Sequence, residues 1–169
     1  MWNARTMLTV GGTMLVAALM VGGCLSGPAF GPVEKPPQGL PPFGEIESDE
    51  AASVIVALLD DPSFVSLDIR TPAEVKSGHL PGAVNVDFRS STFDAEIDRL
   101  DRNATYLIYC RTANRTGQAY VRMMEMGFAK VYDMQGGITQ WIQLGYPVCV
   151  GTLGEHTCAG EYPTPAAEG

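Results

Sequence analysis

Apolar and polar positions along the middle of the chain alternate between two periods, which predicts strands and helices in turn. Short apolar runs of strand length occupy residues 64–68, 83–86, 105–109 and 130–132. Apolar residues recur at helical spacing over residues 48–59, 72–77, 93–100, 116–126 and 137–144. Strands that alternate with helices over short links predict an α/β fold, with a mainly parallel central sheet flanked by helices.

Local signals mark the ends of several of these elements. Thr71 and Glu74 have the spacing of a capping box, and Pro72 stands at the first helical position between them. Gly78 and Gly127 each follow a predicted helix, where a glycine commonly ends the helical backbone. These signals predict a short helix after residue 71 and a longer one that ends before Gly127.

The first 23 residues have the pattern of an export signal. Arg5 precedes an apolar stretch, and Val21-Gly22-Gly23-Cys24 follows it. This ending resembles the lipobox of bacterial lipoproteins, which implies cleavage before Cys24 and a lipid on that cysteine. An uncleaved membrane helix and an ordinary signal peptide are the alternatives, since residues 6–23 are close to the shortest length that spans a bilayer. Each interpretation places the core outside the cytoplasm, and the first predicts a lipid-anchored protein of the bacterial cell envelope that faces the periplasm or extracytoplasmic space.

The chain therefore divides into four expected parts. A signal peptide over 1–23 precedes a Pro/Gly-rich tether over 24–44, which is expected to be semi-extended and to bury nothing. A folded domain over 45–149 is long enough for one core. A C-terminal tail over 150–169 is rich in small residues.

Charge narrows the range of partners. The formal net charge is −8, so nucleic-acid binding, which usually needs a basic face, is not expected. Against this acidic background, Arg111 and Arg115 follow Cys110 closely. They predict a local anion site beside that cysteine.

Cys110 lies where a reactive thiol is expected. It follows the apolar run 105–109 and precedes a loop and a helix, so backbone N–H groups and the helix dipole favour the thiolate. The arginines of the loop act in the same direction. No histidine is close in sequence to serve as a base. This arrangement predicts a nucleophile or a sulfur carrier, although a buried structural thiol is the simpler alternative.

Four motifs occur in the order that the rhodanese family of sulfurtransferases shows, and together they cover the predicted core. The chain resembles this family at Leu67-Asp68-Ile69-Arg70, Gly78-His79-Leu80-Pro81-Gly82-Ala83, Tyr109-Cys110-Arg111-Thr112-Ala113-Asn114-Arg115-Thr116, and Gly136-Gly137-Ile138 with Trp141 and Gly145-Tyr146-Pro147. The resemblance implies a five-stranded parallel sheet. It also implies that Cys110 accepts a sulfane sulfur from an anionic, thiosulfate-like donor and passes it to a thiol or cyanide. We expect a monomer that needs no cofactor.

The length of the loop separates two kinds of chemistry. Related phosphatase loops have five residues between cysteine and arginine, whereas four separate Cys110 from Arg115 here, which favours sulfur over a phosphoryl group. Phosphatase or arsenate reductase activity is therefore the weaker enzymatic alternative. The expected anion-binding loop consists of Arg111, Thr112, Ala113, Asn114, Arg115 and Thr116. Asn114 is expected to brace it by hydrogen bonds, and Ala113, where the family usually has glycine, is strained if its φ is positive.

Residues outside the loop are assigned supporting roles. Asp68 and Arg70, with Glu74, are expected to form ion pairs and caps that hold the end of the sheet, and a functional charge cluster is the alternative. His79 is expected to be a structural turn residue, and Trp141 a core residue. A non-enzymatic rhodanese-like module for binding or redox sensing is the alternative function for the whole domain.

Two cysteines remain near the C-terminus. Cys149 and Cys158 are expected to pair in a disulfide in an oxidising compartment. Alternatively, they are free thiols that exchange with Cys110, or they bind a metal together with His156. The sequence shows no fourth ligand, so no metal site is expected.

Overall fold

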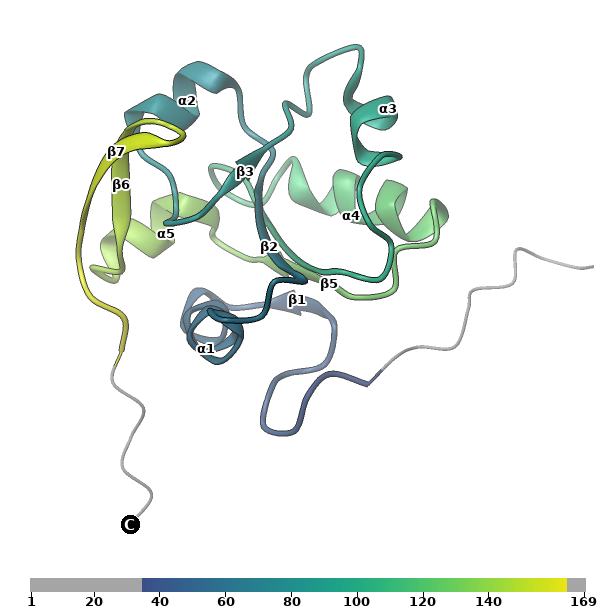
Figure 1. The fold of residues 1–169 in the computed structure, drawn as a ribbon, viewed down its shortest axis with the longest axis horizontal. Helices are drawn as coiled ribbons and strands as arrows, with labels where there is room; N and C mark the ends of the chain where they lie inside the picture. The colour runs from purple at the N-terminus through teal and green to yellow at the C-terminus, as the bar shows by residue number, and fades with distance from the viewer. Residues whose placement is uncertain (1–34, 164–169) are drawn as a thin grey trace, which may run out of the picture.

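A computed structural model describes residues 35–163 and shows a five-stranded sheet with helices on both faces (Figure 1). All its strand pairs are parallel, in the order β1-β5-β4-β2-β3, and the predicted fold class is confirmed. The strands of this sheet are β1 (Gly44–Ile46), β2 (Phe64–Asp68), β3 (Val84–Asn85), β4 (Thr105–Tyr109) and β5 (Val131–Met134). The helices are α1 (Ser48–Leu58), α2 (Pro72–Ser77), α3 (Phe93–Ile97), α4 (Thr116–Glu125) and α5 (Gly137–Gln143). Two further strands, β6 (Val148–Thr152) and β7 (Glu155–Ala159), form a separate antiparallel hairpin.

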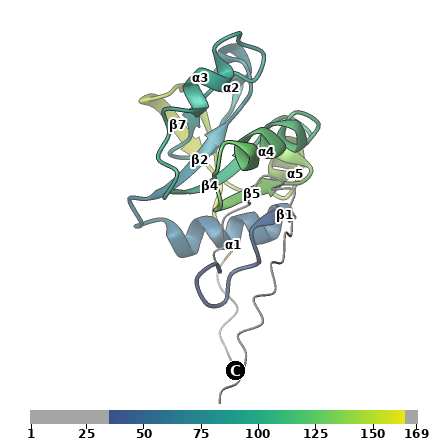
Figure 2. The same cartoon turned by 90° about the vertical axis from the view of Figure 1, so that its right-hand side faces the viewer.

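Two apolar clusters cover the two faces of the sheet. One joins α1 and α5 to alternate residues of the strands, and Trp141 is fully buried in it, as predicted. The other joins α3 and α4 to the opposite residues, and Cys110 belongs to this second cluster. The strands read as continuous apolar runs because both of their faces are covered. Figure 2 shows α1 and α4 on opposite sides of the strands.

Most predicted elements fall within a few residues of the observed ones, and β2 and β4 have the predicted bounds. The capping box is present, since Glu74 N–H donates to Thr71 Oγ1 at 3.4 Å and Thr71 N–H donates to the Glu74 carboxylate at 3.1 Å. Helix α3 ends at Ile97 rather than residue 100. These agreements show that local pattern is sufficient for the central elements.

The hairpin of β6 and β7 was not predicted, and β6 crosses the boundary that was expected at residue 149. Every residue of β7 is exposed, so its sequence carries no alternation of buried and exposed side chains. The hairpin packs beside α2 (Figure 1). The segment that was predicted to be a tail therefore contains a strand of the folded structure.

The segment before β1 also departs from expectation. Leu40 and Phe43 pack against the first apolar cluster, and the Tyr132 hydroxyl donates to the Pro41 carbonyl at 3.2 Å. The expectation that the tether buries nothing was therefore wrong for this part of it. The predicted signal peptide and Cys24 lie outside the described residues. Within 35–163, no helix is long and apolar enough to span a bilayer.

Candidate active site

Cys110 lies at the carboxyl end of β4, which is the edge of a parallel sheet where ligands usually bind. Its side chain is 1% exposed and packs in the cluster that α4 covers. It is the free cysteine of the described residues. The sequence prediction of its position, between a strand and a helix, is confirmed.

The loop that follows Cys110 presents backbone donors. Within residues 35–163, the N–H groups of residues 111–115 donate to no protein acceptor. The ten-residue helix α4 begins directly after them at Thr116. Free N–H groups next to a helix N-terminus stabilise a bound anion, whether that anion is the sulfur of Cys110 or a donor molecule.

The backbone of this loop is strained at Ala113. Its φ is +63°, the left-handed region, and it is the one residue other than glycine with a positive φ among those the structure describes. The strain anticipated from the sequence is therefore present. The Ala113 carbonyl accepts hydrogen bonds from Thr116 Oγ1 at 3.0 Å and from Gly117 N–H at 3.4 Å, and these bonds fix the turn. Asn114 was expected to brace the loop, but within 35–163 its exposed side chain makes no hydrogen bond; Thr116 takes that role.

Helix α5 supports the loop from the other side. Ile138 N–H donates to the Cys110 carbonyl at 2.9 Å, and Thr139 N–H donates to the Arg111 carbonyl at 3.1 Å. These contacts tie the start of the loop to the first turn of α5. They require glycine at 137, because a Cβ there would lie 2.5 Å from the Cys110 carbonyl oxygen. The sequence motif Gly136-Gly137 thus has its physical reason in a close backbone approach.

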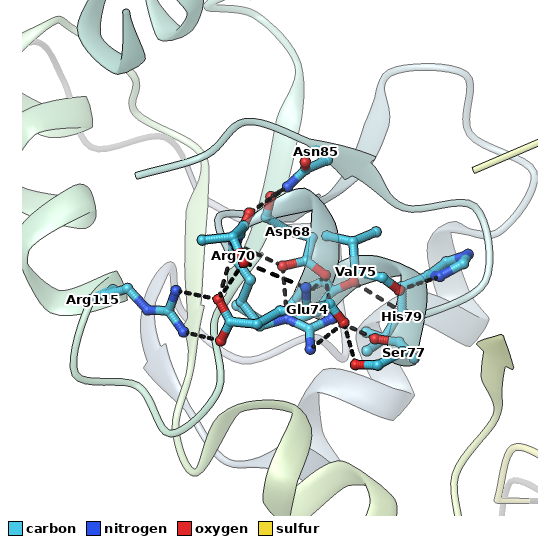
Figure 3. A network of polar contacts seen from close by, with 12 residues as sticks. Asp68, Arg70, Glu74, Val75, Ser77, His79, Asn85 and Arg115 are labelled. Atoms are coloured by element: carbon cyan, nitrogen blue, oxygen red, sulfur yellow. Dashed lines mark hydrogen bonds and ion pairs between the residues drawn. The ribbon is translucent and has the colours of Figure 1, made fainter. Parts of the chain in front are cut away.

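Arg115 connects the loop to α2. Its two terminal nitrogens donate to the two carboxylate oxygens of Glu74 at 2.9 and 2.7 Å (Figure 3). These bonds hold the pKa of Glu74 at about 2 and raise the pKa of Arg115. The Cys110 sulfur contributes to the same upward shift of the Arg115 pKa, after the larger effect of Glu74. The pair with Glu74 fixes the position of the Arg115 charge in the loop that follows Cys110.

A second ion pair lies beneath α2. The Arg70 side chain donates to Asp68 Oδ1 at 2.9 Å and to Asp68 Oδ2 at 3.1 and 2.5 Å, and it also donates to the Gly78 carbonyl at 2.5 Å (Figure 3). Asn85 closes the network by donating to the carbonyls of Asp68 and Arg70 at 2.7 and 2.8 Å. Asp68 is fully buried and Arg70 is 4% exposed. The pair fixes the loop from β2 to α2, so these two residues have the supporting role that was expected of them.

Two features of the site, the partner of Glu74 and the burial of Asp133, were not predicted from the sequence. Glu74 was predicted to form a cap and ion pairs with its neighbours, but its contact with Arg115, 41 residues away, was not predicted. Asp133 near the end of β5 is 1% exposed, and burial raises its pKa. A carboxylate inside the apolar run 131–134 was a visible signal of an unusual environment, but the Glu74 contact had no local signal.

The remaining predicted residues lie at the rim or elsewhere. Arg111 and Thr112 are exposed, so the Arg111 charge is available to solvent and to an incoming anion. Cys149 and Cys158 form a disulfide with each other, as expected, and neither is bonded to Cys110. The structure thus brings the loop, Glu74 and α5 together around Cys110 and places the two other cysteines in the hairpin.

The model of the rhodanese-like domain matches residues 51–144, which include Cys110 and its entire loop. The chain belongs to the rhodanese-like domain family. A protein of Allochromatium vinosum named sulfurtransferase is 31% identical to it over 104 residues, which cover 62% of this chain and 92% of that protein. Thiosulfate sulfurtransferase 16, chloroplastic, of Arabidopsis thaliana is 29% identical over 114 residues, 60% of this chain and 95% of the relative.

Other relatives share the rhodanese-like domain within different proteins. The tRNA uridine(34) hydroxylase of Pectobacterium atrosepticum is 33% identical over 96 residues, but the match spans only 26% of its length. Among solved structures, a rhodanese-related protein from Thermoplasma volcanium superposes with a TM-score of 0.53 at 26% identity, over 63% of this chain and 97% of that one. The fold and the family are therefore shown. The matches to the two relatives named as sulfurtransferases cover nearly the whole length of those proteins.

Proposed function

We propose that this rhodanese-like protein is a sulfurtransferase that carries sulfur as a persulfide on Cys110. The observation that supports the proposal most directly is the surroundings of Cys110: free N–H groups, the start of α4, and an arginine held by Glu74. All of these groups favour a negative charge at one point. The sulfurtransferase relatives agree with this chemistry.

The reaction has two steps, each a displacement at sulfur. The Cys110 thiolate attacks the outer sulfur of a thiosulfate-like donor; a sulfur–sulfur bond forms to Cys110, and sulfite leaves with the electrons of the broken bond. Cyanide or a thiolate then attacks the terminal sulfur of the persulfide and releases the Cys110 thiolate. The exposed Arg111 attracts the anionic donor, while Arg115 and the loop N–H groups stabilise the persulfide anion.

The location of the protein is part of the proposal. We propose that Cys24 carries a lipid and holds the domain at the outer side of a bacterial cytoplasmic membrane or within the cell envelope. The disulfide between Cys149 and Cys158 supports an oxidising compartment, because such bonds persist there and are rare in the cytosol. Metabolic labelling with a fatty acid tests the anchor: label is expected in the wild type and not in Cys24→Ser.

The experiment for the activity is cyanolysis with thiosulfate, followed by intact mass spectrometry of the donor-treated protein. The wild type is expected to gain the mass of one sulfur atom on Cys110 and to produce thiocyanate. Cys110→Ala is expected to lose at least ~10³-fold in rate, since it removes the attacking atom. Equal rates for the two proteins would disprove the proposal, and a failure of several sulfur donors to modify Cys110 would favour the non-enzymatic module.

A further inference from the structure

Four side chains that can bind a metal meet beside the hairpin. Cys149 on β6 is directly opposite Cys158 on β7, and His156 lies two residues before Cys158 and so on the same face of that strand. His79 comes from the loop after α2. Its backbone pairs with that of Cys149 through two hydrogen bonds of 2.9 and 2.8 Å.

His79 is oriented like a metal ligand. Its side chain is fully buried, and Nδ1 lies 3.0 Å from the Val75 carbonyl oxygen (Figure 3). A carbonyl can only accept, so Nδ1 carries the proton, and the tautomer that can bind a metal then has its lone pair on Nε2. That Nε2 is buried and has no hydrogen-bond partner among residues 35–163. An Nδ1–H bond to a carbonyl is the usual way in which proteins orient an imidazole whose Nε2 binds a metal.

The candidate ligand atoms are already close together. Those of His79, Cys149 and His156 all lie within 4.8 Å of one another, and the two imidazole rings stand 5.0 Å apart at 86°. The Cys158 sulfur is bonded to the Cys149 sulfur, so it also lies next to these ligand atoms. Tetrahedral ligands on zinc are about 3.3–3.8 Å apart for bonds of about 2.0–2.3 Å. The imidazoles and sulfurs would therefore approach one another by up to about 1.5 Å, and the two sulfurs would separate by about 1.7 Å after reduction.

We propose that the hairpin is a switchable zinc site: when the Cys149–Cys158 disulfide is reduced, the two thiolates bind Zn²⁺ together with His79 and His156. Cys₂His₂ is a common structural zinc set, and mixed sulfur and nitrogen ligands in a tetrahedron select zinc. The sequence offered only three of these ligands. The fold supplies the fourth, His79, from a position 70 residues before Cys149.

The exchange between the two states requires a dithiol reductant. A thiolate of the reductant attacks the sulfur of the exposed Cys158, and the buried Cys149 leaves as a thiolate next to both histidines. The second thiol of the reductant then releases Cys158 and becomes a disulfide itself. The two electrons pass from the dithiol to the protein disulfide, two protons go to solvent, and Zn²⁺ takes both thiolates.

The structure allows this change without disturbing the core. His156 and Cys158 are exposed and belong to β7, whose residues all face solvent, so the hairpin can adjust around the fixed His79 and Cys149. Cys110 takes no part, because it lies in the cluster under α4. The zinc site is therefore independent of the proposed sulfur transfer.

Metal titration of the full chain tests the proposal. Protein treated with a dithiol and then freed of it is expected to bind one Zn²⁺ per chain in competition with a chromophoric chelator, whereas the disulfide form is not. Co²⁺ in place of zinc should show tetrahedral d–d bands and sulfur-to-cobalt charge transfer. His156→Ala, an exposed substitution that leaves the disulfide intact, should weaken binding by at least ~10-fold.

Matched variants make each result decisive. Glu155→Gln removes a neighbouring exposed carboxylate and should bind zinc as the wild type does. Cys110→Ser and Cys24→Ser should also keep the stoichiometry, so a failure of the proposed sulfur transfer would leave this result unaffected. The proposal is overturned if the dithiol leaves the disulfide intact by mass, if reduced and oxidised protein bind zinc equally, or if His156→Ala and Glu155→Gln have the same affinity.

Discussion

The two sulfur sites of this protein differ in what surrounds the sulfur. Around Cys110 stand hydrogen-bond donors and a cation, namely free loop N–H groups, the start of α4 and Arg115. Around Cys149 stand the imidazoles of His79 and His156, and the buried Nε2 of His79 has no hydrogen-bond partner within residues 35–163. The first environment favours a sulfur that carries negative charge and attacks; the second favours one that is tied to another sulfur or to a cation. We therefore propose two chemistries for the same side chain, because its neighbours differ.

Among the variants that test this difference between the two sulfur sites, the largest effect is expected from removing the positive charge of Arg115, near Cys110. Arg115→Gln should lower kcat/KM for thiosulfate by about 100-fold, since one charged donor to a developing anion is lost. Steady-state cyanolysis measures this. Arg122→Gln removes an exposed arginine of α4, the helix that follows Arg115, and should stay close to wild type; Arg122 is paired with Asp94. Equal losses in both variants would mean that α4 contributes only general charge.

A substitution in the hairpin should change the stability of the protein rather than its rate of sulfur transfer. Cys158→Ser opens a disulfide between residues nine apart in sequence and should lower the free energy of unfolding by about 2–3 kcal/mol. The rate of sulfur transfer by Cys110 should be unchanged in this variant at temperatures where the variant is folded. Denaturant unfolding with and without a reductant measures the difference, and the reductant should have no further effect on the variant. A lost turnover in the folded variant would show that the two sulfur sites are not independent.

The link between Glu74 and Arg115 gives a pH-dependent effect. Because the pKa of Glu74 in the folded protein is about 2, below its ordinary 4.5, the carboxylate stabilises the fold above pH 4.5 and loses this contribution as pH falls through about 2. The Glu74 side chain is 30% exposed, which reduces the value of the pair to about 1 kcal/mol.

Unfolding of Glu74→Gln at several pH values measures this contribution. The variant should be about 1 kcal/mol less stable than wild type near neutral pH, and the gap should close on acidification. The exposed Glu125→Gln is the control and should show no such dependence. A gap that is constant down to pH 2 would mean that the ion pair does not stabilise the fold.

The smallest effect is expected at the strained turn. Ala113→Gly relieves a left-handed backbone and should raise the free energy of unfolding by about 0.5 kcal/mol, after the entropy of glycine in the unfolded chain is subtracted. Ala95→Gly, at an exposed position of α3, should instead lower it. Thermal unfolding of both variants decides between relief of strain and a general glycine effect.

The sequence was sufficient wherever a local rule applied. Covered strands such as β4 are apolar throughout, the Thr71–Glu74 box marks the start of α2, and the position of Ala113 in its motif pointed to a strained turn. Contacts that the fold makes between distant residues had no such rule. Arg115 and Glu74 are 41 residues apart, and nothing in the pattern around His79 shows that Cys149 lies against it. The exposed strand β7 lacks the apolar period from which strands are predicted.

The contacts of α5 with the Cys110 loop bear on the order of events during synthesis. The carbonyls of Cys110 and Arg111 are held by the N–H groups of Ile138 and Thr139, which leave the ribosome nearly thirty residues later. A nascent chain that ends before Thr139 has the thiol but not the complete support of its loop. The support of the Cys110 loop is therefore completed late, after most of the sheet has been made, and truncated chains are expected to display an ordinary cysteine.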